Sequence, residues 1–183
     1  MKKITITFII LFVTVSIFAQ DNTLSKFGDL CTACNNNTAD YARSGCRTFT
    51  DLCDVLTADK EVFIEKEGKK IKRVAFAYQN DGQLEYGVKA AISFVNKKGK
   101  VVQSFDDGNM LIMSKDGRIT RSVSTKMTNP SLLKLEQGET VLFVFATGLP
   151  YKKRDKLKVK INISKLDTST RQEKVFKEMN AKI

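Results

Sequence analysis

Residues 156–164 have the sequence Lys-Leu-Lys-Val-Lys-Ile-Asn-Ile-Ser, in which every second side chain is apolar. A repeat of two is the period of a β-strand, because successive side chains of a strand point to opposite faces of the sheet. We therefore expect Leu157, Val159, Ile161 and Ile163 to face a core. Lys156, Lys158 and Lys160 then form a row on the solvent face, about 7 Å apart along the strand.

Short stretches of the same kind fill the chain from residue 61 onward, separated by residues typical of turns. A hairpin turn is expected at Gly68, and Asn80-Asp81-Gly82 is a second strong turn motif. A further break is expected at Gly148-Leu-Pro150. The strands expected before residue 156 are 61–65, 71–79, 84–95, 101–105, 110–114, 119–126, 132–135 and 140–147.

Two of these strands differ from the rest in polarity. Residues 119–126 are more polar, which is typical of an edge strand. Val141-Leu-Phe-Val-Phe145 is continuously apolar, which favours a central strand covered on both faces. Short strands with turns at intervals of roughly 8–12 residues, and no helix between them, predict an all-β sandwich or barrel over residues 58–166.

Residues 167–183 have a different pattern. Thr170 and Glu173 have the spacing of a helix capping box, and Val175, Phe176, Met179 and Ile183 follow at helical spacing. We expect a short C-terminal amphipathic helix. It either packs on the sandwich or binds a partner.

Three motifs follow one another in the strand-rich region. Ala91-Ile-Ser-Phe-Val-Asn96 precedes a Lys-Gly turn, and Met110-Leu-Ile-Met113 precedes Asp116-Gly117-Arg118. Leu135-x-x-Gly138-Glu139 then leads into the apolar strand at 141–145. Over about residues 84–164 this order resembles the telokin-like, immunoglobulin-like domains of exported bacterial proteins of the Bacteroidota type. The resemblance implies an antiparallel immunoglobulin-like β-sandwich with an accessory or adhesive role, and it transfers no catalytic residue.

Residues 1–19 have the pattern of a secretory signal peptide: Lys2 and Lys3, an uncharged stretch at 4–18, and a small residue at Ala19. The apolar stretch is shorter than the roughly 20 residues that a membrane-spanning helix needs. We therefore expect cleavage after Ala19 and export to the periplasm or the medium. No later segment is apolar enough to cross a membrane.

All four cysteines lie in the segment 20–57, at Cys31, Cys34, Cys46 and Cys53. An even number of cysteines behind a signal peptide predicts structural disulfides, because exported compartments are oxidising. Three pairings are possible. The sequence does not choose among them.

Other uses of these cysteines fit less well. A c-type haem site needs a histidine after Cys34, and the chain contains none. A zinc site prefers close cysteine pairs at both ends, whereas Cys46 and Cys53 are widely spaced. A thioredoxin-like redox pair needs a βαβ setting, which the pattern lacks. No cofactor and no metal site is expected.

A basic segment follows the apolar strand. Tyr151 precedes a run that is opposed only by Asp155 and comprises Lys152, Lys153, Arg154, Lys156, Lys158 and Lys160. The formal net charge of the chain is +11, which favours contact with polyanions and solubility. Two interpretations stay open. The lysines protect an edge strand from pairing, or they bind an anionic glycan or lipid head group. Aromatic residues are not interleaved, so sequence-specific nucleic-acid recognition is not expected.

The sequence offers little for catalysis. Without histidine, Ser-His-Asp and Cys-His arrangements are excluded. Asp106 and Asp107 are the obvious carboxylate pair, but both lie beside Gly108 in an expected turn. The main hypothesis is an exported, non-catalytic binding or accessory module whose partner is a protein or an anionic envelope glycan or lipid. The alternatives are polyanion binding through the basic strand and, less favoured, a carboxylate-dependent hydrolase.

Overall fold

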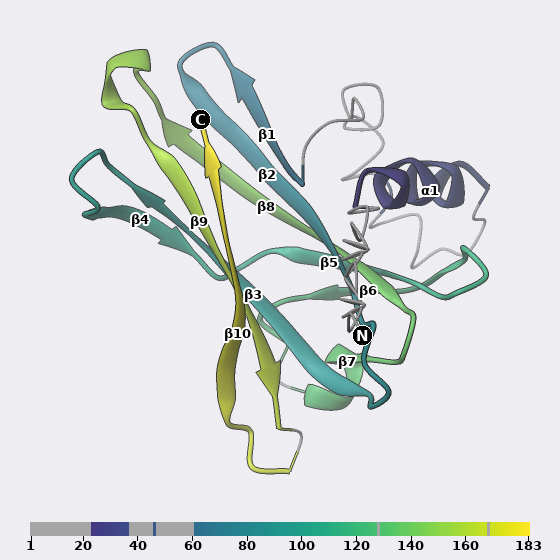
Figure 1. Ribbon diagram of the computed structural model, residues 1–183. Helices are drawn as coiled ribbons and strands as arrows, with labels where there is room; N and C mark the ends of the chain where they lie inside the picture. The colour runs from purple at the N-terminus through teal and green to yellow at the C-terminus, as the bar shows by residue number, and fades with distance from the viewer. Residues whose placement is uncertain (1–22, 37–45, 47–60, 128, 168) are drawn as a thin grey trace, which may run out of the picture.

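The computed structural model describes residues 23–36, 46, 61–127, 129–167 and 169–183 (Figure 1). The ten strands of this part pair antiparallel throughout and form two sheets. The first sheet contains, in spatial order, β1 (Val62–Glu67), β2 (Lys70–Gln79), β8 (Thr140–Pro150), β5 (Asn109–Met113) and β6 (Ile119–Ser124). The second contains β10 (Glu173–Lys182), β9 (Lys158–Leu166), β3 (Tyr86–Val95) and β4 (Val101–Phe105), with β7 (Lys134–Leu135) also paired to β3. The other elements are α1 (Thr23–Asn36) and the 3₁₀ turns η1 (Pro130–Leu133) and η2 (Lys153–Asp155).

The strand order matches that of an immunoglobulin-type sandwich. The neighbours β1-β2-β8-β5 correspond to the A-B-E-D sheet, and β10-β9-β3 correspond to G-F-C. The strand β4 extends the second sheet beside β3, and β6 extends the first sheet beside β5. The expected antiparallel immunoglobulin-like β-sandwich is confirmed.

Alternating side chains of both sheets fill the space between them. Val159, Ile161 and Ile163 of β9 are fully buried, as the repeat at 156–164 predicts. They pack in one cluster with apolar residues of β3 and β8, such as Phe94 and Phe143.

The strand β8 is apolar on both faces because both faces are covered. Phe143 and Phe145 point into the space between the sheets, where their rings stack on Phe76. Leu142 and Val144 point the other way, into a second apolar cluster. The expectation of a central strand covered on both faces is confirmed, and so is the edge position of β6 at 119–124.

The helix α1 provides the cover on the outer face of the first sheet (Figure 1). Its apolar residues Phe27, Leu30 and Ala33 are buried in the same cluster as Leu142 and Val144. This helix was not predicted from the sequence pattern. The described part of the chain therefore has three layers: helix, first sheet and second sheet.

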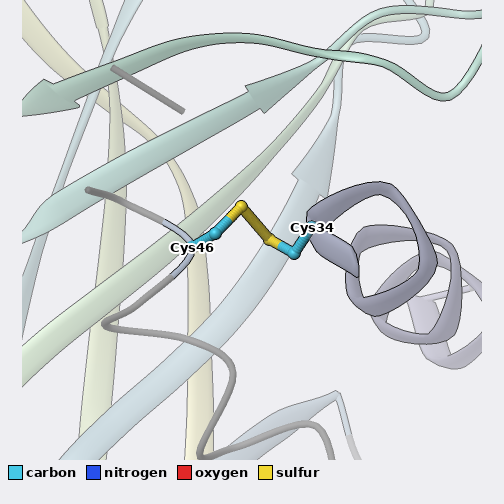
Figure 2. The surroundings of a disulfide bond; sticks show 2 residues. All are labelled: Cys34 and Cys46. Carbon is cyan, nitrogen blue, oxygen red and sulfur yellow. A yellow bond between two sulfur atoms is a disulfide. The ribbon is translucent and has the colours of Figure 1, made fainter. Parts of the chain in front are cut away.

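A disulfide between Cys34 and Cys46 ties α1 to the chain that follows it, with the two Cα atoms 5.3 Å apart (Figure 2). Both cysteines are buried in the cluster beneath α1. Cys31 is also disulfide-bonded. The disulfide-tied N-terminal segment is confirmed at these positions, whereas Cys53 and the signal peptide expected at 1–19 lie outside the described residues.

The C-terminal helix expected at 167–183 is wrong, because residues 173–182 form β10, which pairs with β9 along its whole length. Of the two residues that suggested a helix cap, Glu173 begins β10 and Thr170 belongs to a hairpin turn, where the Asp167 carboxylate accepts hydrogen bonds from the backbone of Ser169 and Thr170. A β-bulge then shifts the register at Phe176. Beyond it, Met179, Ala181 and Ile183 share the inner face at a period of two.

Two smaller expectations also need correction. Gly148 does not end β8: Thr147 and Gly148 form a bulge opposite Lys72, and the strand continues to Pro150. The positive φ of Gly148, 54°, permits that bulge. Of the strand expected at 132–135, the first two residues belong to the 3₁₀ turn η1, and only Lys134 and Leu135, which form β7, pair with β3.

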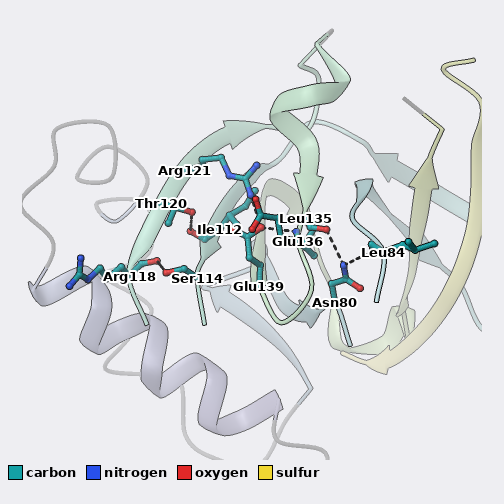
Figure 3. A network of polar contacts seen from close by, with 10 residues as sticks. All are labelled: Asn80, Leu84, Ile112, Ser114, Arg118, Thr120, Arg121, Leu135, Glu136 and Glu139. Atoms are coloured by element: carbon teal, nitrogen blue, oxygen red, sulfur yellow. Dashed lines mark hydrogen bonds and ion pairs between the residues drawn. The ribbon is translucent and has the colours of Figure 1, made fainter. Parts of the chain in front are cut away.

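Buried polar groups join the loops at the end of the sandwich where β2 ends and β8 begins (Figure 3). The amide of Asn80 donates to the carbonyl groups of Leu84 and Leu135, and the carboxylate of Glu139 accepts from Arg121 and from the backbone of Glu136.

Among the described residues, no helix is both long and apolar enough to span a bilayer.

Candidate anion-binding site

An open pocket of about 550 Å³ lies at the other end of the sandwich. The strand registers bring together there the end of β1, the connector between β8 and β9, and the end of β10. Figure 1 shows the C-terminus at this end, near the turn between β1 and β2. The residues that line the pocket are Lys66, Tyr151, Lys153, Lys156, Leu157, Lys158, Lys182 and Ile183. Five of these eight are lysines and none is acidic.

Two of the lysines are direct cross-strand partners. Lys158 of β9 is paired in register with Lys182 of β10, and both side chains are exposed. Side chains that are directly opposite have Cβ atoms about 5 Å apart, and like charges in such a pair are unfavourable. An anion bound between the two ammonium groups would relieve this repulsion.

The connector between β8 and β9 is held in a defined conformation. The Asp155 carboxylate accepts a hydrogen bond of 3.0 Å from the backbone of Lys152, so the only acidic residue of the connector is engaged at its own turn. Lys156 follows η2 with a positive φ of 44°, a left-handed conformation that is uncommon for a residue with a side chain. This conformation lets the chain enter β9 with Leu157 buried and Lys156 at the pocket.

The floor of the pocket is apolar. The half-buried ring of Tyr151 lies beneath the ammonium group of Lys66, which is 5.2 Å from the ring centroid. The backbone of Tyr151 donates a hydrogen bond of 2.6 Å to the carbonyl of Lys69, which ties the connector to the turn between β1 and β2. Leu157 and Ile183 complete the floor and are joined by a backbone hydrogen bond.

The lysines of the pocket are not neutralised by carboxylates of the described chain. None of the five has a carboxylate oxygen within 4.0 Å among the described residues. Glu65 and Glu67, the two neighbours of Lys66 on β1, form ion pairs with Lys72 instead. The pocket therefore combines an apolar, partly aromatic floor with several positive charges that have no ion-pair partner in the described part of the chain.

The structure brings together three of the six basic residues singled out in the sequence, namely Lys153, Lys156 and Lys158. Lys152 and Arg154 are exposed on the same connector but do not line the pocket. Lys160 lies on the sheet face and forms an ion pair of 3.1 Å with Glu178 of β10. The expected row of three lysines is thus reduced, since Lys156 precedes the strand and Lys160 is neutralised.

Edge protection, the structural interpretation of these lysines, is wrong, because β9 is an interior strand between β10 and β3. The error follows from the missed strand β10, which occupies the edge. Lys182 was not predicted as a pocket residue for the same reason, because a residue assigned to a C-terminal helix is not expected to pair with Lys158. Lys66 was missed because it is 92 positions away in sequence from Lys158, and only the hairpin at Gly68 indicates that it lies at the same end.

The carboxylates considered for a hydrolase do not converge in the described part. Asp106 and Asp107 are both exposed, and Asp107 forms an ion pair with Lys126. The backbone carbonyl of Asp106 accepts a hydrogen bond from Thr125, as expected of a loop residue. Among the described residues, no cluster of three or more possible acidic, cysteine or histidine ligands for a metal ion occurs.

No protein-family model and no curated protein matches the chain. Among solved structures, the fold is similar to part of a β-glucuronidase of Bacteroides uniformis, with a TM-score of 0.39 and 10% sequence identity. The matched region covers 66% of this chain and 12% of that enzyme. A likeness at this level carries no argument about function.

Proposed function

We propose that the protein is an exported, non-catalytic binding module of the telokin-like, immunoglobulin-like type, which holds an acidic sugar residue of an anionic glycan in the pocket between β1, β9 and β10. The observation that carries this proposal is the presence of five lysine side chains, and no acidic side chain, among the described residues that line one pocket. The strand order of the sandwich supports the proposed type, because it matches the A-B-E-D and G-F-C sheets.

The charges of the pocket favour an anion. Two ammonium groups held about 5 Å apart repel each other by roughly 0.8 kcal/mol in water, and an anion between them makes the interaction attractive. Lys158 and Lys182 are direct cross-strand partners with Cβ atoms about 5 Å apart, and Lys153, Lys156 and Lys66 add three further positive charges. Long lysine stems allow these charges to adapt to sulfate, phosphate or carboxylate groups.

The apolar floor favours an anion that is part of a sugar. Binding sites for small molecules combine apolar walls with a few polar groups that fix orientation. Tyr151, Leu157 and Ile183 supply such walls. The carbon-bound hydrogens of a sugar ring can pack on the walls while its acidic substituent meets the lysines.

The disulfide supports export. The Cys34–Cys46 bond and the bonded state of Cys31 suit an oxidising compartment such as the periplasm or the medium. Anionic glycans are abundant outside the cytoplasm, so the proposed ligand and the proposed location agree.

The test is retention of the mature protein on immobilised heparin, a glycan that carries both sulfate and carboxylate groups. The wild type should bind at low salt and elute as salt rises, because salt screens the charges. Lys153→Gln/Lys158→Gln/Lys182→Gln should elute at a clearly lower salt concentration. Its free energy of unfolding should not fall, since the change removes a repulsive cross-strand pair.

A matched variant controls for net charge. Lys115→Gln/Lys126→Gln/Lys174→Gln removes the same charge at exposed positions outside the pocket and should elute close to the wild type. Equal elution of the two triple variants would contradict the pocket as the binding site. Stronger binding to vesicles with anionic lipids than to heparin would assign the ligand to a membrane instead.

A further inference from the structure

The basic pocket belongs to a larger basic surface. The registers place three segments at the same end of the sandwich: residues 66–70, which contain the turn between β1 and β2 and the strand residues beside it, residues 96–100 between β3 and β4, and residues 151–158 before and at the start of β9. The end of β10, at Lys182 and Ile183, joins them there. We call these four segments the basic end.

Nearly all the net charge of the chain is concentrated on this surface. The only acidic residues of the basic end are Glu67 and Asp155, whereas the formal net charge of the whole chain is +11. Its twelve basic residues are Lys66, Lys69, Lys70, Lys97, Lys98, Lys100, Lys152, Lys153, Arg154, Lys156, Lys158 and Lys182. All twelve are exposed, and none has a carboxylate oxygen within 4.0 Å among the described residues. A composition that served only solubility would not need to place its excess charge at one end.

The turn between β3 and β4 presents its lysines from a fixed backbone. The side-chain oxygen of Asn96 accepts hydrogen bonds from the backbone of Lys98 and Lys100, at 2.9 and 3.0 Å. Gly99 closes the turn with a positive φ of 76° and a backbone bond to Asn96. A preformed turn loses less conformational entropy on binding than a flexible one would.

This turn lies directly beside the pocket. Val95, the last residue of β3, is paired with Lys158, which in turn is paired with Lys182. From β10 across β9 and β3 to β4 there are three strand spacings, about 14 Å in all. The positive surface thus extends beyond the pocket, past the reach of a single acidic sugar.

From this arrangement we infer that the ligand is an extended polyanionic chain, which places one acidic residue in the pocket and continues over the turn at residues 96–100. This inference rests on the proposed function and specifies its ligand as a polymer rather than a small acidic sugar. Lys97, Lys98 and Lys100 bind the part of the chain that lies outside the pocket. Because they touch only a long ligand, they distinguish a long chain from a short one.

The test compares heparin disaccharide with full-length heparin, by calorimetry on the mature protein. The turn variant Lys97→Gln/Lys98→Gln/Lys100→Gln should bind the disaccharide like the wild type. Its affinity for the long chain should fall at least tenfold, and the slope of log affinity against log salt should become shallower by about two to three, since three counterion-releasing contacts are lost. The control is again Lys115→Gln/Lys126→Gln/Lys174→Gln, which should change neither measurement.

The outcomes separate the two proposals. The pocket variant is Lys153→Gln/Lys158→Gln/Lys182→Gln. If the turn variant binds the long chain as well as the wild type does, while the pocket variant does not, the inference of an extended ligand is wrong and the proposed function of the pocket stands. Equal affinity of the wild type for disaccharide and long chain would likewise overturn the extended ligand. If the wild type binds neither form, the proposed function itself fails, and the inference with it.

Discussion

The hydroxyl groups of Tyr78 and Tyr86 form a hydrogen bond with each other at the end of the sandwich opposite the basic pocket. Tyr78 belongs to the first sheet and Tyr86 to the second, so this bond links the two layers. The ring of Phe176, displaced by the bulge in β10, makes edge-on contacts with both tyrosine rings at centroid distances of 5.3 and 6.0 Å. The ammonium group of Lys165 lies 4.1 Å from the Tyr86 ring centroid. This cluster closes one end of the core, while the other end stays open as the pocket.

The two tyrosines give the fold a sensitivity to alkaline pH. Burial raises the pKa of Tyr78 far above its ordinary value, and the hydrogen bond with Tyr86 and the charge of Asp81 raise it further. Since the unfolded chain releases this proton near pH 10, the stabilisation is complete below about pH 10 and is lost as pH rises toward the pKa of the folded state. The free energy of unfolding should therefore fall above about pH 10.

Tyr78→Phe isolates this effect from the ionisation of lysines in the same pH range. Below pH 10 the variant should lose about 1 kcal/mol, the typical net contribution of one hydrogen bond. Above pH 10 its stability should fall less steeply than that of the wild type. Tyrosinate absorbance of the folded wild type provides the direct measurement. If all tyrosines ionise together near pH 10 while the fold is intact, the cluster does not shield Tyr78.

The side chain of Asn80 also links several segments of the chain at this end of the sandwich. It is fully buried, and its side chain donates to the carbonyl groups of Leu84 and Leu135 and accepts from the backbone of Gly82 (Figure 3). Asn80→Ala would leave the buried carbonyl group of Leu135 without this donor, so the free energy of unfolding should fall by about 1–3 kcal/mol. Chemical denaturation measures it.

Asn109→Ala is the matched control for Asn80, since Asn109 is exposed and its side chain makes no hydrogen bond with the described residues that would be lost. Its effect should stay within about 0.5 kcal/mol. Equal losses in the two variants would show that the loops around Asn80 are held by other contacts.

The sequence predicted the sandwich because burial has a clear period in most strands. β9 alternates from Lys158 to Ile163, β8 is apolar on both faces, and Gly68 and Asn96 are in turns as expected. These features depend on local pattern alone. The polar edge strand β6 belongs to the same group.

The parts that failed depend on tertiary context. Residues 173–183 have few apolar positions, and those at 175, 176, 179 and 183 fit a helix as well as a bulged strand. Residues 173–182 form a strand rather than a helix because the backbone groups at the open edge of β9 need hydrogen-bond partners. The helix α1 forms over the apolar outer face of β8, which a short segment with four cysteines did not suggest. The sequence predicted part of the pocket. Lys153, Lys156 and Lys158 are close together in the sequence, whereas Lys66 and Lys182 are brought to the pocket by the pairing of strands that are distant in the sequence.

The Cys34–Cys46 disulfide should stabilise the helical layer. It closes a loop with a sequence separation of 12, which corresponds to about 3 kcal/mol in the chain-entropy model. Cys34→Ser/Cys46→Ser should therefore unfold at lower denaturant concentration. Because α1 covers Leu142 and Val144, the variant should also bind more of a hydrophobic dye. Unchanged dye binding together with unchanged stability would mean that packing of Phe27 and Leu30 holds α1 in place without the covalent tie.

Gly108 and Gly28 should respond in opposite directions to the same substitution. A Cβ on Gly108 would lie 2.8 Å from two ring carbons of Phe145 and 2.9 Å from the carbonyl oxygen of Val144. The backbone there has little room to move, because Gly108 donates to the Thr125 hydroxyl and accepts from the Thr125 backbone. Gly108→Ala should therefore lower the free energy of unfolding by about 1–3 kcal/mol through overpacking.

A Cβ on Gly28 meets no atom within 4 Å, and the residue is exposed in the middle of α1. Gly28→Ala should raise the free energy of unfolding by roughly 0.5–1 kcal/mol, because alanine loses less backbone entropy in a helix than glycine does. Denaturation of both variants under the same conditions gives the comparison. A stabilised or unchanged Gly108→Ala variant would show that Phe145 can move away, and that the core around Phe76 and Phe145 is looser than their stacked rings imply.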